Sequence, residues 1–170
     1  MNIQKDLATG SMGENIVTKI FENSQFEVKK NDGTVDNLID WDLVCTTFTG
    51  TLFSKIIKLE VKNDLYAEKS GNIAIEFWNS RKNKEAGINA TKADLWVHII
   101  PNSGVYITSI KRLKNYIANN PSFRTIFSGG DGNADMYLYK MHDILPAVFV
   151  ECSKLTPDEL RKTVEDLLHE

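Results

Sequence analysis

The stretch Leu95–Ile100 reads Leu-Trp-Val-His-Ile-Ile and is almost wholly apolar. Such a run is typical of a β-strand that is buried on both of its faces. With 170 residues the chain is long enough to bury this strand inside one domain. The apolar fraction of 42% and the charged fraction of 25% are those of an ordinary globular protein. We therefore expect a single domain over residues 1–170.

The first element that the pattern predicts is a helix from about Met12 to Asn23. Apolar residues recur at helical spacing along one face of this stretch: Ile16, Val17, Ile20 and Phe21. Ser11 and Glu14 fit a capping box, with Ser11 as the N-cap and the Glu14 carboxylate reaching back to it. Capping the helix is therefore one of two roles that Glu14 can have.

Further elements follow from alternation, turn residues and caps. The predicted strands cover residues 26–29, 40–48, 52–61, 73–78, 95–100, 105–108, 136–141 and 147–150. The predicted helices cover residues 109–119 and the segment after Thr156, which has Pro157 at its first position and Glu159 closing a capping box. A loop with a short helix is expected over residues 80–93. This order predicts an α/β domain with a mixed sheet flanked by helices.

The formal net charge of −3 argues against a basic protein that coats nucleic acid. It does not argue against a nuclease, because the local field around a site decides which ligands it attracts. Between Phe53 and Lys92 the chain carries eight lysines and arginines against five acids. For any single lysine in this segment, a solvated surface position remains the simpler explanation.

The cysteines and histidines offer no zinc site. Cys45 and Cys152 lie far apart in apolar runs, so we expect both to be buried free thiols. The three histidines are scattered along the chain. No apolar run reaches the length of a membrane helix and the first residues have no signal-peptide core, which favours a cytoplasmic protein.

Charged residues interrupt two neighbouring predicted strands. Glu60 and Lys62 are two apart, so their side chains share one face, while Leu59 and Val61 point into the core. Asp42 on the preceding strand completes a cluster of two carboxylates and one ammonium. Hard oxygen ligands of this kind suit Mg²⁺ or Mn²⁺ together with a phosphate. Asp40 shares a face with Asp42, so a shift in strand register would exchange the two.

Asp42, the triplet Glu60-Val61-Lys62 on the next strand, and a preceding helix with an acid near its start resemble the PD-(D/E)xK nuclease superfamily. The core of that fold is restriction-endonuclease-like: helix, three antiparallel strands, helix, strand. The resemblance covers residues 11–100 and leaves residues 101–170 as a C-terminal strand and helix extension packed on this core. Trp41 stands where the superfamily often has proline.

Within the superfamily, Glu14 occupies the place of the helix glutamate of Holliday-junction resolvases. The segments 71–76, 86–88 and 91–94 are similar to small phage-encoded endonucleases of this type. The resemblance implies a Mg²⁺-dependent DNA endonuclease, often a homodimer on duplex or branched DNA, and a host-cytoplasmic enzyme if it is phage-encoded. Asp42 and Glu60 would bind the metal, with Glu14 and the Val61 carbonyl as further ligands.

Other residues receive supporting roles in this hypothesis. Lys62 would position or activate the attacking water, and Glu76 is a possible additional acid. The expected nucleic-acid contacts are Lys92, Thr91, Lys82 and Lys84. Two alternatives stay open: a nuclease-like fold that binds nucleic acid or protein without cutting, and a surface ion pair in which Lys62 points away from the carboxylates.

Overall fold

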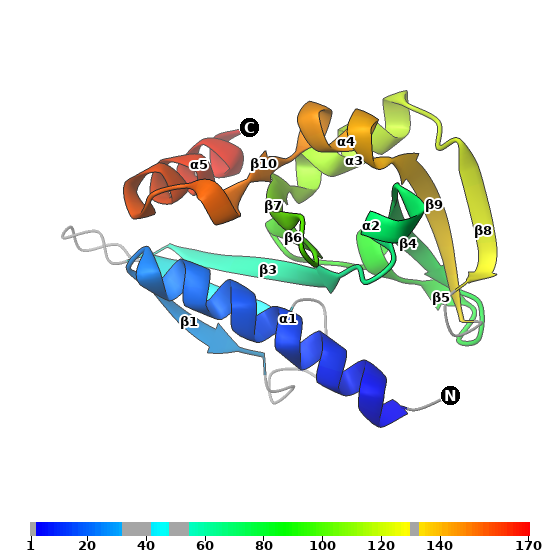
Figure 1. The fold of residues 1–170 in the computed structure, drawn as a ribbon, viewed down its shortest axis with the longest axis horizontal. Coiled ribbons are helices and arrows are strands. Elements are labelled where there is room, and N and C mark those ends of the chain that lie inside the picture. The colour runs from blue at the N-terminus through cyan, green and yellow to red at the C-terminus, as the bar shows by residue number, and fades with distance from the viewer. Residues whose placement is uncertain (1–2, 32–41, 48–54, 130–132) are drawn as a thin grey trace.

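The computed structural model describes residues 3–31, 42–47, 55–129 and 133–170. Two sheets organise the chain (Figure 1). Sheet A has the strand order β1-β2-β3-β6-β7-β10, and sheet B has the order β5-β4-β9-β8. The strands are β1 (Phe26–Lys30), β2 (Leu43–Thr47), β3 (Ile56–Asn63), β4 (Asn72–Asn79), β5 (Lys84–Glu85), β6 (Leu95–Ile100), β7 (Gly104–Ser109), β8 (Arg124–Gly129), β9 (Ala134–Lys140) and β10 (Val150–Glu151).

Helices lie between and around these strands. They are α1 (Ile3–Asn23), α2 (Ala67–Ser70), α3 (Ile110–Asn119), α4 (Met141–Val148) and α5 (Pro157–His169), with 3₁₀ turns η1 (Gly87–Asn89) and η2 (Cys152–Lys154). Sheet A is mixed. Its β3 and β6 run parallel to each other, whereas every other pair of neighbouring strands in this sheet is antiparallel. The α/β class with a mixed sheet flanked by helices is therefore confirmed.

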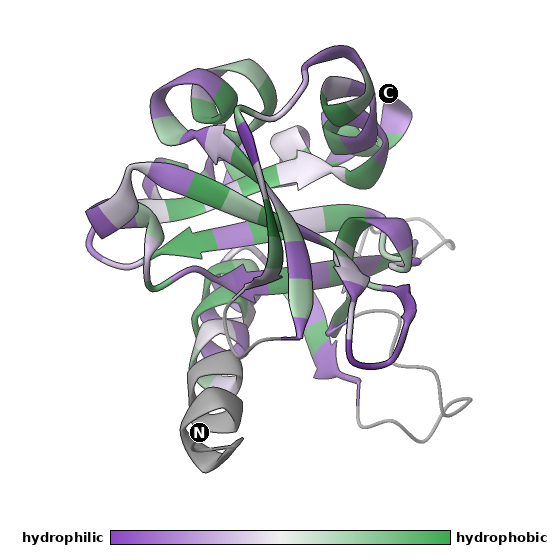
Figure 2. Ribbon diagram, turned by 90° about the vertical axis from the view of Figure 1, so that its right-hand side faces the viewer, coloured by the Kyte–Doolittle hydropathy of each residue, from purple (hydrophilic) through white to green (hydrophobic). Residues whose placement is uncertain are grey.

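Strand β6 is buried along its whole length, as its sequence predicted. Leu95, Val97 and Ile99 join a core with residues of α1 and α5, whereas Trp96 and Ile100 join a second core with residues of β4, α3 and α4. Successive side chains of a strand point to opposite faces, so each face of β6 needs its own apolar cover. Figure 2 shows the same pattern, with hydrophobic residues concentrated on the central strands.

The connection from β3 to β6 carries α2, β4, β5 and η1. Because β3 and β6 are parallel neighbours, the chain must cross over between them. Here the crossover holds only a single α-helical turn, and its longest element is β4, which pairs with β9 from the C-terminal part of the chain. Residues 101–170 thus contribute strands to both sheets, and β8 and β9 stand at the end of the molecule away from α5 (Figure 1).

Two sequence predictions about helices are corrected. Helix α1 begins at Ile3, so Ser11 lies inside it and the predicted capping box with Glu14 is wrong. The upstream residues 4–8 are mostly good helix formers, and they extend the helix past the first cap-like residue. The predicted strand 147–150 is borne out only at its last residue, because α4 runs to Val148 and buries Ile144 and Val148, four residues apart, and the strand β10 begins at Val150.

Other predictions hold. Helix α5 has the full capping box between Thr156 and Glu159, and Cys45 and Cys152 are buried free thiols. Residues 40–41, 48 and 52–54 of the predicted strands lie outside the described residues. Strand β8 was not predicted from the sequence. No helix in the described parts of the chain is long and apolar enough to cross a membrane.

Candidate active site

Glu60 and Lys62 meet on one face of β3. The Lys62 Nζ lies 2.5 Å from Glu60 Oε1, and Glu60 is only 8% exposed. The second oxygen, Oε2, accepts a hydrogen bond of 3.0 Å from the Thr91 hydroxyl. Both oxygens of this nearly buried carboxylate are therefore engaged. Thr91 therefore holds Glu60 directly, while its predicted contact with nucleic acid stays a prediction.

Asp42, the residue immediately before β2, lies beside Glu60 and Lys62. Leu43 pairs with Leu59 across the antiparallel ladder, which puts Asp42 level with Glu60. Its Oδ2 accepts a 2.6 Å hydrogen bond from the Val61 N–H, and its own N–H donates to the Leu59 carbonyl at 2.8 Å. The register therefore places Asp42 in the cluster, whereas Asp40 and Trp41 lie outside the described residues.

Burial and nearby carboxylates raise the pKa of Asp42 to about 6. Burial disfavours the charged form, and the neighbouring charges of Glu60 and Glu14 act in the same direction. Lys62 and the Val61 N–H oppose the rise without cancelling it. Asp42 is thus ionised at neutral pH at an energetic cost, which a bound cation would relieve.

Lys62 is held as a cation. Burial alone would lower its pKa, but the charges of Glu60 and Asp42 more than compensate, and the pKa lies above its ordinary value. Its Nζ also lies 5.6 Å from the centroid of the Trp96 ring, a cation–π distance. A lysine that stays protonated can orient a water or neutralise a phosphate, but it cannot take a proton as a general base. The alternative of a surface pair with Lys62 pointing away does not describe this site, because Lys62 Nζ lies 2.5 Å from Glu60 Oε1 and Glu60 is only 8% exposed.

Glu14 approaches the cluster from α1, which packs against β1, β2 and β3. A Cβ on the preceding residue, Gly13, would lie 3.1 Å from the Asn63 Cβ, so glycine permits this close approach. The Glu14 Oε2 lies 3.2 Å from Lys30 Nζ, and its charge contributes to the raised pKa of Asp42. Because Glu14 does not cap the helix, its effect on the pKa of Asp42 is the link to the site that the structure shows.

The residues fit magnesium better than zinc. Among the residues that the structure describes, no group of three or more His, Cys, Asp or Glu side chains is arranged to hold a metal ion. Mg²⁺ does not need such a group, because it is usually held by one or two carboxylates, several waters and a substrate phosphate. Asp42 and Glu60 supply those carboxylates. The roles of Glu14 and the Val61 carbonyl as ligands stay predictions.

A buried hydrogen-bonded chain supports this site, and sequence reasoning did not find it. The Trp96 indole N–H donates to His98 Nδ1 at 3.3 Å, so His98 carries its proton on Nε2 and donates it to Asp64 Oδ2, also at 3.3 Å. Burial raises the pKa of Asp64, but His98 and the amides of Tyr66 and Ala74 outweigh it and leave the pKa low. Asp64 therefore ties the end of β3 to β4 and α2.

The remaining predicted residues are spread over the surface around the cluster. Lys92 is exposed directly after Thr91. Glu76 lies on β4, and its charge contributes to the raised pKa of Lys62. Lys82 and Lys84 are exposed on and beside the turn between β4 and β5. Thr91 and Glu76 thus interact with the cluster, while contacts of Lys92, Lys82 and Lys84 with nucleic acid stay predictions.

Comparison with known proteins adds no relative: no family model matches the chain, and no curated protein or solved structure matches it significantly.

Replacing Glu14 with glutamine tests its link to Asp42. We expect the pKa of Asp42 to fall, because a negative charge that raises it is removed. The free energy of unfolding should change by less than about 0.5 kcal/mol, since a partly exposed pair with Lys30 contributes little. A carboxyl NMR titration and urea unfolding measure the two quantities. Glu22→Gln, an exposed change on the same helix, is the control, and an unchanged Asp42 pKa would separate Glu14 from the site.

Proposed function

We propose that this protein is a Mg²⁺- or Mn²⁺-dependent endonuclease that hydrolyses phosphodiester bonds in DNA and acts in the cytoplasm. The observation that carries the proposal is the cluster of Asp42, Glu60 and Lys62, in which two carboxylates and a permanent cation share a mostly buried site. The antiparallel run β1-β2-β3 and the parallel pairing of β3 with β6 support a restriction-endonuclease-like fold of the PD-(D/E)xK type.

Each residue has a role in this proposal. Asp42 and Glu60 would hold the metal ion, which when bound would polarise the phosphate and neutralise the charge that develops during in-line displacement. Thr91 fixes the orientation of Glu60 through its hydroxyl. Lys62, kept protonated, would orient the attacking water or stabilise the phosphate oxygens as charge builds on them. Lys92, exposed directly after Thr91, would contact a neighbouring phosphate.

One observation favours a second candidate, a nuclease-like domain that binds nucleic acid without cutting it. The Glu60 carboxylate already has two internal partners, Lys62 and Thr91, so it is satisfied without a metal ion. In the metal-loaded site proposed above, at least one of these contacts would lengthen. Cleavage, rather than binding, therefore decides between the two candidates.

The test is incubation with plasmid, linear duplex, single-stranded and four-way-junction DNA in Mg²⁺, Mn²⁺ or EDTA. We expect cleavage of at least one substrate with either metal and none in EDTA. Glu60→Gln should lose the activity, while Glu165→Gln, an exposed acid on α5, should keep it. DNA binding with no cleavage of any substrate would support the second candidate instead.

A further inference from the structure

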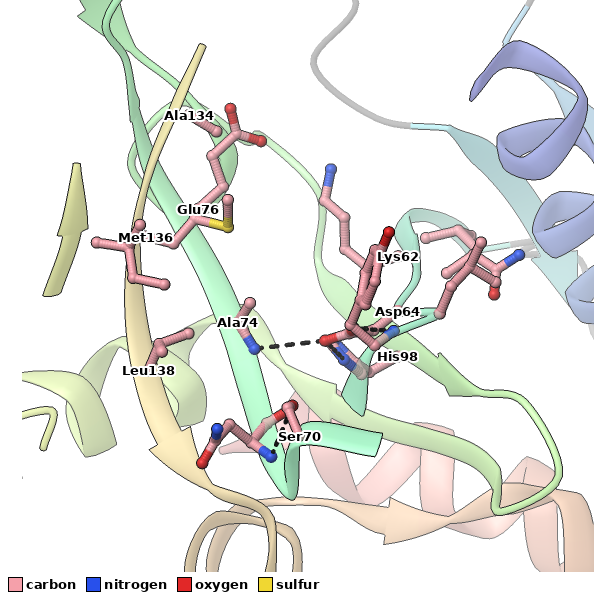
Figure 3. Close-up of a pocket in the computed structure, with 15 residues that line it drawn as sticks. Lys62, Asp64, Ser70, Ala74, Glu76, His98, Ala134, Met136 and Leu138 are labelled. Carbon is pink, nitrogen blue, oxygen red and sulfur yellow. Dashed lines mark hydrogen bonds and ion pairs between the residues drawn. The ribbon is translucent and has the colours of Figure 1, made fainter. Parts of the chain in front are cut away.

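A cleft of about 630 Å³ opens beside the candidate active site. One wall is the end of β3 and the segment after it, and the other wall is sheet B (Figure 3). Its volume is within the roughly 300–1,000 Å³ range of pockets that hold small organic groups. Lys62 and Glu76 line it and extend toward the same end of the cleft in Figure 3. The cleft is therefore continuous with the proposed catalytic cluster.

The wall from sheet B is apolar at its centre and charged at its margin. Residues that pair directly across antiparallel strands share one face, and the observed register places one set of residues on the cleft side. This set is Asn72, Ala74, Glu76, Arg124, Ile126, Met136, Leu138 and Lys140. The apolar members line the cleft, whereas Arg124 and Lys140 are exposed beside it.

Polar groups and one aromatic ring complete the opposite wall. Tyr66 lines the cleft and is 75% exposed, so a face of its ring is available to a ligand. Asp64 and His98 also line the cleft, but these two side chains are hydrogen-bonded to each other. A flat, partly apolar ligand that also carries a phosphate fits this combination of an apolar wall, an exposed ring and marginal cations.

We propose that this cleft receives one unpaired nucleobase of the DNA strand beside the phosphate that is cleaved. A base stacked within a duplex has both faces covered, so only an unpaired or flipped base can enter an enclosed pocket. Tyr66 would stack on the base, and the apolar wall of β8 and β9 would cover its other face. Arg124 and Lys140 would contact the adjoining phosphate.

This inference rests on the proposed function and narrows it. The preferred substrate is DNA that carries an unpaired nucleotide at a bulge, flap or branch, cut next to that nucleotide. Because Lys62 belongs to both the cleft and the cluster, a base in the cleft places its own phosphate near Asp42 and Glu60. A fully paired duplex would have to pay the unstacking energy first.

Binding in EDTA tests the inference without any cleavage. Fluorescence anisotropy compares three labelled duplexes: fully paired, with one unpaired nucleotide, and with an abasic residue at that position. We expect the unpaired base to bind roughly tenfold or more tightly than the abasic analogue. Tyr66→Ala should remove most of this difference, and Phe127→Ala, an equally exposed aromatic outside the cleft, should preserve it.

A second variant fills the cleft. Ala74→Trp projects a ring from the wall and should abolish the preference for the unpaired base, while Ala118→Trp on an exposed position of α3 should not. Circular dichroism establishes that both variants fold, and if Ala74→Trp does not, Tyr66→Ala alone decides. A preference that survives in the folded variants would overturn the inference.

The outcomes separate this inference from the proposed function. Equal affinity for all three duplexes overturns the inference even if the enzyme cuts DNA in Mg²⁺. Base-dependent binding with no cleavage of any substrate refutes the nuclease but keeps the cleft as a base-binding site. A free mononucleotide, dAMP or TMP, that binds as tightly as the bulged duplex identifies the cleft as a small-molecule site and also overturns the inference.

Discussion

Asp42→Asn is expected to abolish metal-dependent cleavage and to make the metal-free protein more stable at neutral pH. The loss of cleavage should be roughly a thousandfold or more, because a metal-binding carboxylate works as a unit with its neighbours. The gain in stability follows from the raised pKa of Asp42, since asparagine removes a charge that the folded protein holds at a cost. Asparagine can still accept the hydrogen bond from Val61.

The sign of the pH dependence follows from linkage. The carboxyl group of Asp42 binds its proton more tightly in the folded protein, with a pKa of about 6 against an ordinary 3.8. Between these values the folded protein holds a proton that the unfolded chain has lost, so the free energy of unfolding falls as the pH rises. Near pH 4 and below, Asp42 imposes no penalty, and above pH 6 the penalty is complete.

The expected size can be bounded. A pKa rise from 3.8 to about 6 corresponds to roughly 3 kcal/mol, and partial solvent exposure reduces this to about 1–2 kcal/mol. Urea unfolding in EDTA at pH 4, 5.5 and 7.5 should show the mutant gaining this amount at pH 7.5 and almost nothing at pH 4. Glu165→Gln is the control for loss of a surface charge.

Added Mg²⁺ should reverse the order of the two proteins. A metal ion that binds only the folded state stabilises it more as its concentration rises above its Kd, so the melting temperature of the wild-type protein should rise. Asp42→Asn, with one ligand lost, should respond little. An Asp42→Asn protein that is less stable than wild type at pH 7.5 in EDTA would show that the Asp42 carboxylate is a structural group and would contradict the site.

The parts of the fold that depend on local pattern were predictable. The apolar run of β6 gave a strand buried on both faces, and Thr156 with Glu159 fixed the start of α5. The alternation around Glu60 placed it beside Lys62, because neighbours two apart on a strand share a face. Asp42 required the register of β2 with β3, which the hydrophobic alternation of both strands favours.

The parts that depend on distant segments were not predictable. The 147–150 segment is apolar and β-rich, yet tertiary packing of Ile144 and Val148 makes its first two residues helical. Residues 120–129 carry too weak an alternation to reveal β8. The cleft forms only because β4 pairs with β9, sixty residues later, and no local motif encodes that pairing. The role of His98 was hidden for the same reason, since its partner Asp64 comes from the distant segment after β3.

Lys62 and Lys92 should separate catalysis from binding. Lys62→Met keeps the aliphatic stem beside Trp96 but removes the cation, so we expect kcat to fall by roughly a hundredfold or more while the Kd for DNA changes little. Removing the positive charge should also raise the pKa of Asp42 further, because Lys62 is one of the groups that lowers it. The acidic limb of the pH–rate profile should therefore move to higher pH.

Lys92→Ala should have the opposite effect. An exposed lysine that contacts one phosphate contributes affinity that salt screens, so its loss should weaken binding and reduce the slope of log Kd against log salt by about one. Lys111→Ala, an exposed lysine on α3, is the matched control and should change neither quantity. Single-turnover kinetics and binding isotherms at several salt concentrations give both parameters for all three variants. If Lys62→Met and Lys92→Ala lose affinity and turnover in the same proportion, then Lys62 acts as another phosphate contact, and the assignment of its cation to the transition state is wrong.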